Sequence, residues 1–241
     1  MDLTRREAFG ALALGSVALL HSPRAGAAPG KQGSGKSEAG KHTPLPLPFD
    51  PKRLKGISEK LIVSHHDNNY AGAVNNLNKV EGELERVNKD TPGFIVGGLR
   101  ERELTFTNSA ILHELYFGNL GGSGKPGGAI EKALADRFGS FGRWEEGFRA
   151  TGASLGGGSG WTVLAFNFHS GALNTYWAGN HTQAVAFGEP LLVMDMYEHA
   201  YQMDYGAAAA KYIEAFFNNI QWDEVNRRFE RAQKAFTALR A

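Results

Sequence analysis

The sequence contains no cysteine, which excludes disulfide bonds, thiolate metal sites and cysteine nucleophiles. Its 241 residues also carry little net charge, because 26 Lys and Arg stand against 25 Asp and Glu. The folded part has no run of basic residues, so we expect no nucleic acid partner. A hydrophobic fraction of 42% and a charged fraction of 21% are typical of a globular chain with a core.

Long apolar runs are scarce, and the one from Ala8 to Leu20 is too short to anchor a protein in a bilayer. It follows Arg5-Arg6 and precedes the small residues Ala25 to Ala28, which predicts an export signal over residues 1–28. The segment Thr4 to Phe9 resembles a twin-arginine signal and implies export of a folded protein to the periplasm, with no membrane association after signal removal. An ordinary secretory signal that carries two arginines is the alternative.

Residues 29–48 are rich in Gly, Ser, Lys and Pro, and this composition predicts a flexible tether. Helical patterns follow over Ser58 to Asn88 and Glu101 to Leu120, separated by Pro92-Gly93. They predict an antiparallel helical hairpin as the first domain, residues 49–121, with Leu104 and Ile111 among the side chains that face the first helix.

Residues 122–241 form the second predicted domain, in which short strands lie between helices. This clustering favours the α+β class: an N-terminal antiparallel helical hairpin followed by an α/β domain with a three-stranded antiparallel sheet. The helices are expected at 129–138, 141–154 and from 202 to 241, and the strands at 161–168, 172–178 and 190–195.

Asp195 ends the last predicted strand, and His199 follows it where the chain turns toward a helix. A carboxylate oxygen and an imidazole nitrogen can converge there, but two ligands do not make a metal site. Of the eight histidines, His21 lies in the signal and His42 in the tether. The remaining candidates are His65, His66, His113, His169 and His181.

Several motifs occur together in an order that resembles the iron/manganese superoxide dismutase family. The resemblance covers about Leu54 to Ala232 and agrees with the fold expected from the patterns alone. The motifs are Ser64-His65-His66-Asp67-Asn68-Asn69-Tyr70, Val74-Asn75-Asn76-Leu77-Asn78, Leu112-His113-Glu114-Leu115-Tyr116-Phe117, Phe138-Gly139-Ser140-Phe141, Gly158-Ser159-Gly160-Trp161, Asp195-Met196-Tyr197-Glu198-His199-Ala200-Tyr201, Tyr212-Ile213-Glu214-Ala215-Phe216 and Asn219-Ile220-Gln221-Trp222.

The resemblance implies a superoxide dismutase with one iron or manganese ion per chain. Three neutral imidazoles and one carboxylate suit either metal. The register of Val74-Asn75-Asn76 favours His65 over its neighbour His66 as a ligand. The implied metal ligands are His65, His113, Asp195 and His199.

In the family, a Gln or His hydrogen-bonds the solvent on the metal. His181 occupies the matching loop and Ser109 stands where many iron enzymes have a Gln, which favours iron. We therefore expect a catalytic role for His181, with a solvent-facing loop histidine as the alternative. Glu198 beside His199 resembles the family's bridge between subunits and implies a homodimer.

The sequence departs from the family around the substrate gateway. Asn69 and Tyr70 stand where the family has histidines, and Ala73 where it has a tyrosine. Tyr70 is our candidate for a substitute phenol in proton delivery. Tyr197 and Val163 replace tryptophans near the site. These changes leave a second hypothesis open, a metal-binding relative with weak or no dismutase activity that serves a structural, storage or peroxide-related role.

Overall fold

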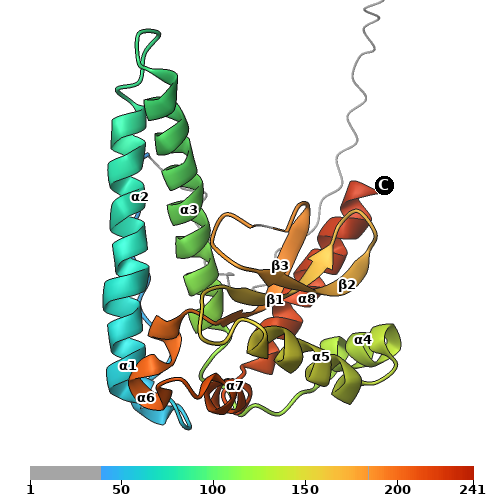
Figure 1. Ribbon diagram of the computed structural model, residues 1–241. Helices are drawn as coiled ribbons and strands as arrows, with labels where there is room; N and C mark the ends of the chain where they lie inside the picture. The colour runs from blue at the N-terminus through green and yellow to red at the C-terminus, as the bar shows by residue number, and fades with distance from the viewer. Residues whose placement is uncertain (1–38, 184) are drawn as a thin grey trace, which may run out of the picture. The chain divides into compact units, whose positions relative to one another are not determined.

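The computed structural model describes residues 39–183 and 185–241 (Figure 1). The predicted export signal and the first part of the predicted tether lie outside the described residues. Within the described part, every helix is too short or too polar to span a bilayer.

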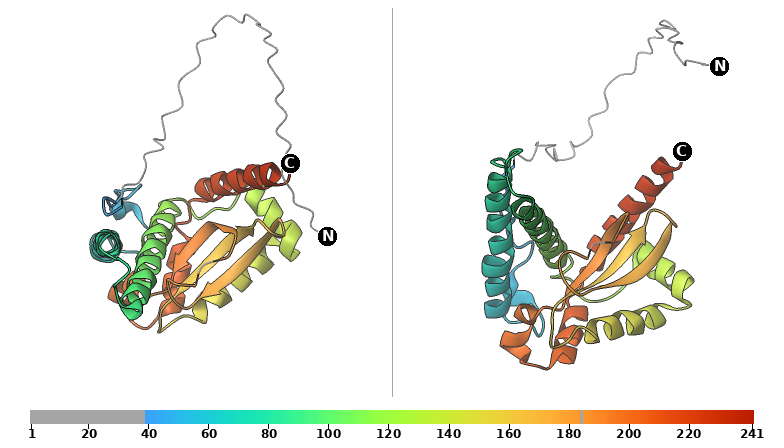
Figure 2. Two further views of the ribbon diagram at one scale, coloured as in Figure 1. Left: turned by 90° about the horizontal axis from the view of Figure 1, so that it is seen from above. Right: turned by 45° about the horizontal axis from the view of Figure 1, so that its top comes forward.

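The N-terminal half is the predicted helical hairpin, in which α2 and α3 run side by side (Figure 2). Ser58 caps the first helix, since its hydroxyl accepts from the Leu61 amide at 3.1 Å. The helix changes to a π-helical turn, η2, in its middle and ends at Leu84. The bounds are α1 Glu59–Ser64, η2 His65–Tyr70, α2 Ala71–Leu84 and α3 Gly93–Gly118.

Helix α3 differs from the prediction at its start and on one face. It begins at Gly93 rather than Glu101, because Pro92 provides the N-cap with extended backbone and the glycines that follow are tolerated in the helix. The expected burial of Leu104 and Ile111 is wrong, since these side chains are 46% and 47% exposed. The buried stripe of α3 contains Ser109, Ala110, His113, Tyr116 and Phe117.

The C-terminal half contains the predicted three-stranded antiparallel sheet in the order β2-β1-β3, which confirms the fold class. Pro190 lies inside the edge strand β3, where the pairing with β1 shifts between Leu164 and Ala165. An edge strand with an irregular register accommodates a proline because no ladder hydrogen bond is lost. The bounds are α4 Gly128–Phe138, α5 Phe141–Ala153, β1 Trp161–Asn167, β2 Ala172–Ala178 and β3 Gly188–Asp195.

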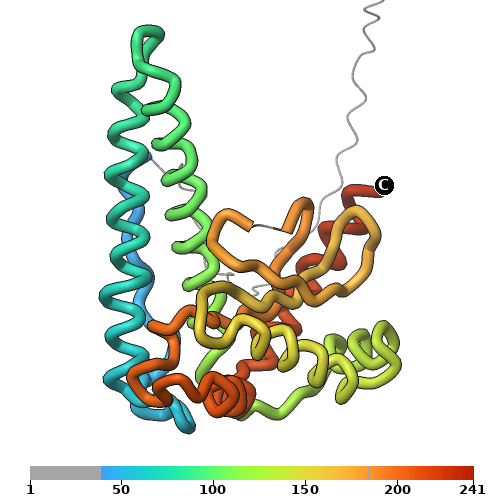
Figure 3. The backbone as a smooth tube through the Cα atoms, viewed as in Figure 1, coloured from blue at the N-terminus to red at the C-terminus, as the bar shows by residue number. Residues whose placement is uncertain are grey.

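After β3 the chain crosses to the hairpin and returns to the sheet (Figure 3). Asp204 marks the crossing, because its carboxylate accepts from the amide and the hydroxyl of Ser58, each at 2.7 Å. The predicted helical tail is therefore divided into short pieces before the long α8. The bounds are η3 Glu198–Ala200, α6 Gln202–Tyr205, α7 Ala209–Phe217 and α8 Trp222–Leu239.

The buried Arg228 joins α8 to both halves of the molecule. Its guanidinium donates to the Leu191 carbonyl in β3 at 3.1 Å and to the Leu115 carbonyl in α3 at 3.2 Å. It also pairs with Glu224 at 2.8 Å, which neutralises the buried charge. The hairpin and the sheet are thus held together near the middle of β3.

Residues 39–48 differ from the expected flexible tether, because hydrogen bonds hold them along the first helix. The His42 amide donates to Asn78 Oδ1, and Asn78 Nδ2 donates to the His42 carbonyl, both at 2.8 Å. The His42 ring lies 2.9 Å from a Glu81 carboxylate oxygen. The composition of this segment offered few apolar groups to bury, but its backbone binds polar side chains of α2.

Candidate metal centre

Three imidazoles converge on one carboxylate oxygen between the hairpin and the end of β3. The Nε2 atoms of His65, His113 and His199 lie 3.1, 3.6 and 3.2 Å from Asp195 Oδ2. One potential ligand atom from each of the four residues lies within 4.8 Å of all the others. Ligands held about 2 Å from one ion have similar separations.

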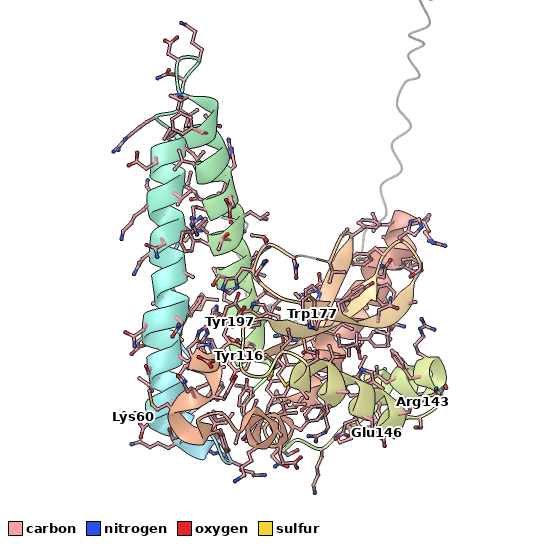
Figure 4. All side chains as sticks on the ribbon, viewed as in Figure 1. Lys60, Tyr116, Arg143, Glu146, Trp177 and Tyr197 are labelled. Atoms are coloured by element: carbon pink, nitrogen blue, oxygen red, sulfur yellow. The ribbon has the colours of Figure 1, made fainter. Side chains whose placement is uncertain are left out.

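Each half of the molecule supplies two of these side chains. His65 begins the π-helical turn and His113 lies on α3, whereas Asp195 ends β3 and His199 lies in η3. Tyr116 and Tyr197, both marked in Figure 4, line the cluster from the two halves. The Tyr116 ring centroid lies 5.2 Å from that of His65, and the Tyr197 centroid 5.3 Å from that of His199.

The polar atoms of this cluster fit a metal ion. Both ring nitrogens of His65 and Nε2 of His113 are buried and lack a hydrogen-bond partner among the described residues. His65 Nε2 is near Asp195 but outside hydrogen-bonding geometry. His113 Nδ1 donates to the Ser109 carbonyl at 2.7 Å, which leaves Nε2 unprotonated in the neutral ring. Buried polar atoms without partners are costly, and a bound cation would satisfy them.

Burial sets the protonation of the cluster. Desolvation lowers the pKa of His113 to about 3 and, assisted by the charges of neighbouring histidines, that of His65 in the same direction. Burial opposes ionisation of Asp195, but His199 and His65 outweigh it and hold its pKa below the usual value. Neutral His65 and His113 beside an ionised carboxylate are the forms that bind a metal.

A cavity of about 230 Å³ opens onto this cluster. Asn69 and Ala73, the expected gateway positions, both line it, and so does His181. A larger cavity of about 570 Å³ beside α3 contains none of the four converging side chains. The remaining residues around the smaller cavity are Asn68, Gly72, Asn76, Phe106, Ser109, His113 and His199.

The hydroxyl of Tyr70, our candidate for a substitute phenol in proton delivery, is engaged by residues outside the metal cluster. This hydroxyl accepts from the Leu45 amide at 2.8 Å and donates to Glu114 Oε1 at 2.9 Å, and the side chain does not line the 230 Å³ cavity. Burial raises the pKa of Tyr70 to about 12. The π-helical turn directs this side chain toward α3 and the N-terminal segment instead of toward the cavity.

His181 lies at the cavity, as expected, and its ring orientation is fixed by two aromatic neighbours. The indole nitrogen of Trp161 donates to His181 Nδ1 at 3.0 Å. The Tyr197 ring stacks on His181 with centroids 4.7 Å apart. Because Trp161 can only donate, Nδ1 is the acceptor and Nε2 carries the proton in the neutral imidazole.

The neighbours of the converging side chains have other surroundings. His66 faces away from the cluster, since its Nε2 donates to the Leu45 carbonyl at 2.8 Å and its Nδ1 lies 2.7 Å from Asp67. Ser109 is buried beside His113, where its carbonyl orients the ring. Glu198 is exposed next to the half-buried His199.

Sequence reasoning missed the cavity residues Asn76 and Phe106. Helical spacing was the available signal, because residues three, four or seven apart share a helix face. Phe106 lies on α3 seven residues before His113, and Asn76 follows Ala73 by three on α2. No local pattern indicated that Trp161 would contact His181, because that pairing arises between a strand and a loop.

Comparisons with known proteins agree with this geometry. Residues 126–228 match the family described as "Iron/manganese superoxide dismutases, C-terminal domain". The chain is 48% identical to "Superoxide dismutase [Fe]" of Cupriavidus metallidurans over 188 residues, which cover 78% of this chain and 95% of the relative. It is 36% identical to "Superoxide dismutase [Fe]" of Aquifex aeolicus, covering 79% and 92% of the two chains. It is 34% identical to "Superoxide dismutase [Mn] 1" of Halobacterium salinarum, covering 79% and 96%. The chain therefore belongs to the iron/manganese superoxide dismutase family.

Proposed function

We propose that this protein converts superoxide to dioxygen and hydrogen peroxide, with one iron or manganese ion held by His65, His113, Asp195 and His199. The main observation behind this proposal is that three imidazole nitrogens converge on one buried carboxylate oxygen. An ion held by these four residues would supply the one-electron redox chemistry that the reaction needs. The relatives named as iron and manganese superoxide dismutases support this assignment.

The protein's own side chains orient the metal ligands and hydrogen-bond the substrate or solvent in the cavity. Ser109 fixes the tautomer of His113, and Trp161 fixes that of His181. We propose that Nε2–H of His181 donates a hydrogen bond to the substrate or solvent in the cavity. Burial lowers the pKa of His181, which keeps the ring neutral and its acceptor nitrogen available to Trp161. The cavity of about 230 Å³ is smaller than sites for drug-sized ligands and suits a diatomic anion and water.

We propose iron as the preferred metal. His181 and Ser109 take the positions where the family's manganese and iron enzymes differ, and the relative that is 48% identical is named an iron enzyme. The hydrogen bond to metal-bound solvent tunes a metal's potential, so the identity of this donor sets which ion is active. Protein reconstituted with each metal separately should show higher turnover per ion with iron; higher turnover with manganese would reverse the assignment.

A homodimer through Glu198 and His199 is also proposed. Glu198 is exposed beside a candidate ligand, so a second copy can reach it without disturbing the buried cluster. Glu198→Ala should shift the protein from dimer to monomer in sedimentation experiments, whereas Glu189→Ala, which removes a carboxylate on β3, should not. A wild-type chain that sediments as a monomer would refute the dimer.

We also propose export to the periplasm, and the twin-arginine pattern in residues 1–28 supports this proposal. Replacing Arg5 and Arg6 by lysine should retain the protein in the cytoplasm, because the paired arginines are the recognised feature. Continued export of this variant would indicate an ordinary secretory signal.

Metal analysis combined with a superoxide assay tests the central proposal. Purified protein should contain close to one iron or manganese per chain and disproportionate superoxide far faster than the free ion. A chain that holds its full complement of metal without this activity would instead support the metal-binding alternative. The altered positions Asn69 and Ala73 are the feature that favours that alternative.

A further inference from the structure

We infer that Asn108 is a positioning residue that holds the His181 loop against α3. The inference rests on the proposed role of His181. Asn108 Nδ2 donates to the His181 carbonyl at 2.6 Å, between residues that are 73 positions apart in the chain. The orientation of the amide follows from its partner, because a carbonyl only accepts and the amide oxygen cannot take this position.

The place of Asn108 on α3 explains how it reaches the loop. Ser109 and His113, four residues apart, face the 230 Å³ cavity and the metal cluster. Asn108 is turned by about 100° from Ser109 and faces the sheet side, where it lines the 570 Å³ cavity together with Trp161. It therefore approaches His181 from a face of α3 different from the one that carries His113.

Asn108 and two aromatic side chains, Trp161 and Tyr197, thus determine where His181 lies. Trp161, in β1, holds the ring through Nδ1, whereas Asn108 holds the backbone through the carbonyl. The hydrogen bond from Asn108 anchors the loop to α3, which also carries His113. The ring centroids of His113 and His181 lie 6.3 Å apart. Loss of this bond would let the loop move relative to α3, and the His181 ring would then leave the Trp161 indole for part of the time.

Among the described residues, the other hydrogen bonds of the loop do not lead to α3. Asn180 Oδ1 accepts from the amide and the hydroxyl of Thr182, and the Gly179 amide donates to Gln183. These contacts shape the loop internally. Ser159 donates to the Gly179 carbonyl at 2.9 Å and fixes only its first residue to the segment before β1.

Orientation of His181 affects its proposed function directly, because Nε2–H must point into the cavity. Displacements near 1 Å in a positioned group can reduce turnover by up to about 100-fold. Asn108 does not line the 230 Å³ cavity and is not a candidate ligand, so its replacement should change the direction of the donor and leave metal binding intact.

Two variants test this inference, with Asn108→Ala removing the donor and Asn108→Asp keeping the size of the side chain but presenting only acceptors. Asn75→Ala, at an exposed asparagine on α2, is the matched control. In nitrogen NMR of the metal-free protein, His181 should show a protonated Nε2 and an unprotonated Nδ1 in the wild type and the control. In both Asn108 variants these signals should average or broaden.

With metal bound, both variants should retain the wild-type metal content and melting profile and lose about 3- to 30-fold in kcat, with KM less affected. Unchanged nitrogen signals in both variants would overturn the inference, and so would loss of metal or of folded structure, because either result makes Asn108 a folding residue. If His181→Ala leaves turnover unchanged, the proposed role of His181 fails, and the metal-free spectra still decide whether Asn108 positions the loop.

Discussion

At the residue scale, Asp195 is the residue around which the site is built, because all three imidazoles lie close to one of its oxygens. The Tyr197 amide donates to the other oxygen at 2.8 Å and fixes the rotation of the carboxylate. This hydrogen bond leaves Oδ2 of the carboxylate directed toward the three imidazoles.

Asp195→Asn should lower metal affinity by more than about 100-fold, since the variant removes the negative charge that offsets the cation as well as one ligand atom. Metal analysis after dialysis against a weak chelator measures the loss. Asp67→Asn, which changes an exposed carboxylate in the neighbouring helical turn, should keep the wild-type metal content. Full metal retention by Asp195→Asn would contradict the ligand assignment.

The gateway positions form the second residue-scale test. Ala73 and Asn69 line the cavity, so Ala73→Tyr combined with Asn69→His would place a phenol and an imidazole beside the cluster. Because a positioned general acid contributes about 100-fold or more, we expect turnover to rise about 3- to 10-fold in a pulse-radiolysis assay. An unchanged rate would mean that proton delivery through the existing residues is already sufficient.

The sequence predicted most of the residues that meet at the site, but it did not predict the direction of each side chain. The resemblance of the sequence motifs to those of the family implied that His65, His113, Asp195 and His199 form one site, and the structure brings these four residues together. The hydrogen-bond partners of Tyr70 could not be predicted, because only the π-helical turn and the N-terminal segment bring its hydroxyl to Leu45 and Glu114. Hydrogen bonds between distant segments leave no local pattern in a sequence.

At the scale of elements, periodicity and turn residues predicted the helices and strands. The errors occur where hydrogen bonds of the backbone determine where an element begins or whether a segment is ordered. Helix α3 starts at Gly93 because the Pro92 carbonyl accepts from the first helical amides, a contact that glycine-rich composition concealed. Similarly, residues 39–48 looked unfolded because they bury few apolar groups. Their order comes from hydrogen bonds to α2.

The role of Asn78 in ordering this segment is testable. Its side chain makes paired hydrogen bonds with the His42 backbone, so Asn78→Ala should lower the free energy of unfolding by about 1 to 2 kcal/mol. Urea titration measures this change, and hydrogen exchange of residues 40–45 should become faster. The exposed Asn75→Ala should have little effect, and equal effects in the two variants would argue against a specific contact.

At the scale of the whole molecule, the metal-free protein should lose stability as the pH falls. The pKa of His113 is lowered from 6.5 to about 3 by burial, so below pH 6.5 the unfolded chain binds a proton that the folded chain does not. Each such histidine lowers the free energy of unfolding by about 1.4 kcal/mol per pH unit in this window, and His65 acts in the same direction. The raised pKa of His199 acts above pH 6.5 and does not offset the loss.

Chemical denaturation of the metal-free protein from about pH 6.5 down to pH 4 measures this slope. His113→Gln should flatten it, because the variant removes one of the two neutral buried imidazoles. A stability that stays constant over this range would contradict burial of His113 and His65 in neutral form. The metal-bound protein should resist acid to a lower pH, because the ion competes with protons for the same nitrogens.

The π-helical turn at His65–Tyr70 also limits which changes of length the chain tolerates. Such a turn holds one residue more than an α-helical turn, so it shifts the phase of α1 relative to α2 by about 100°. Deleting one residue here would produce a continuous α-helix and rotate His65 away from Asp195, although every other residue of the site remained. The spacing between His65 and α2 is therefore more restrictive than the identity of the exposed Asn68 within it.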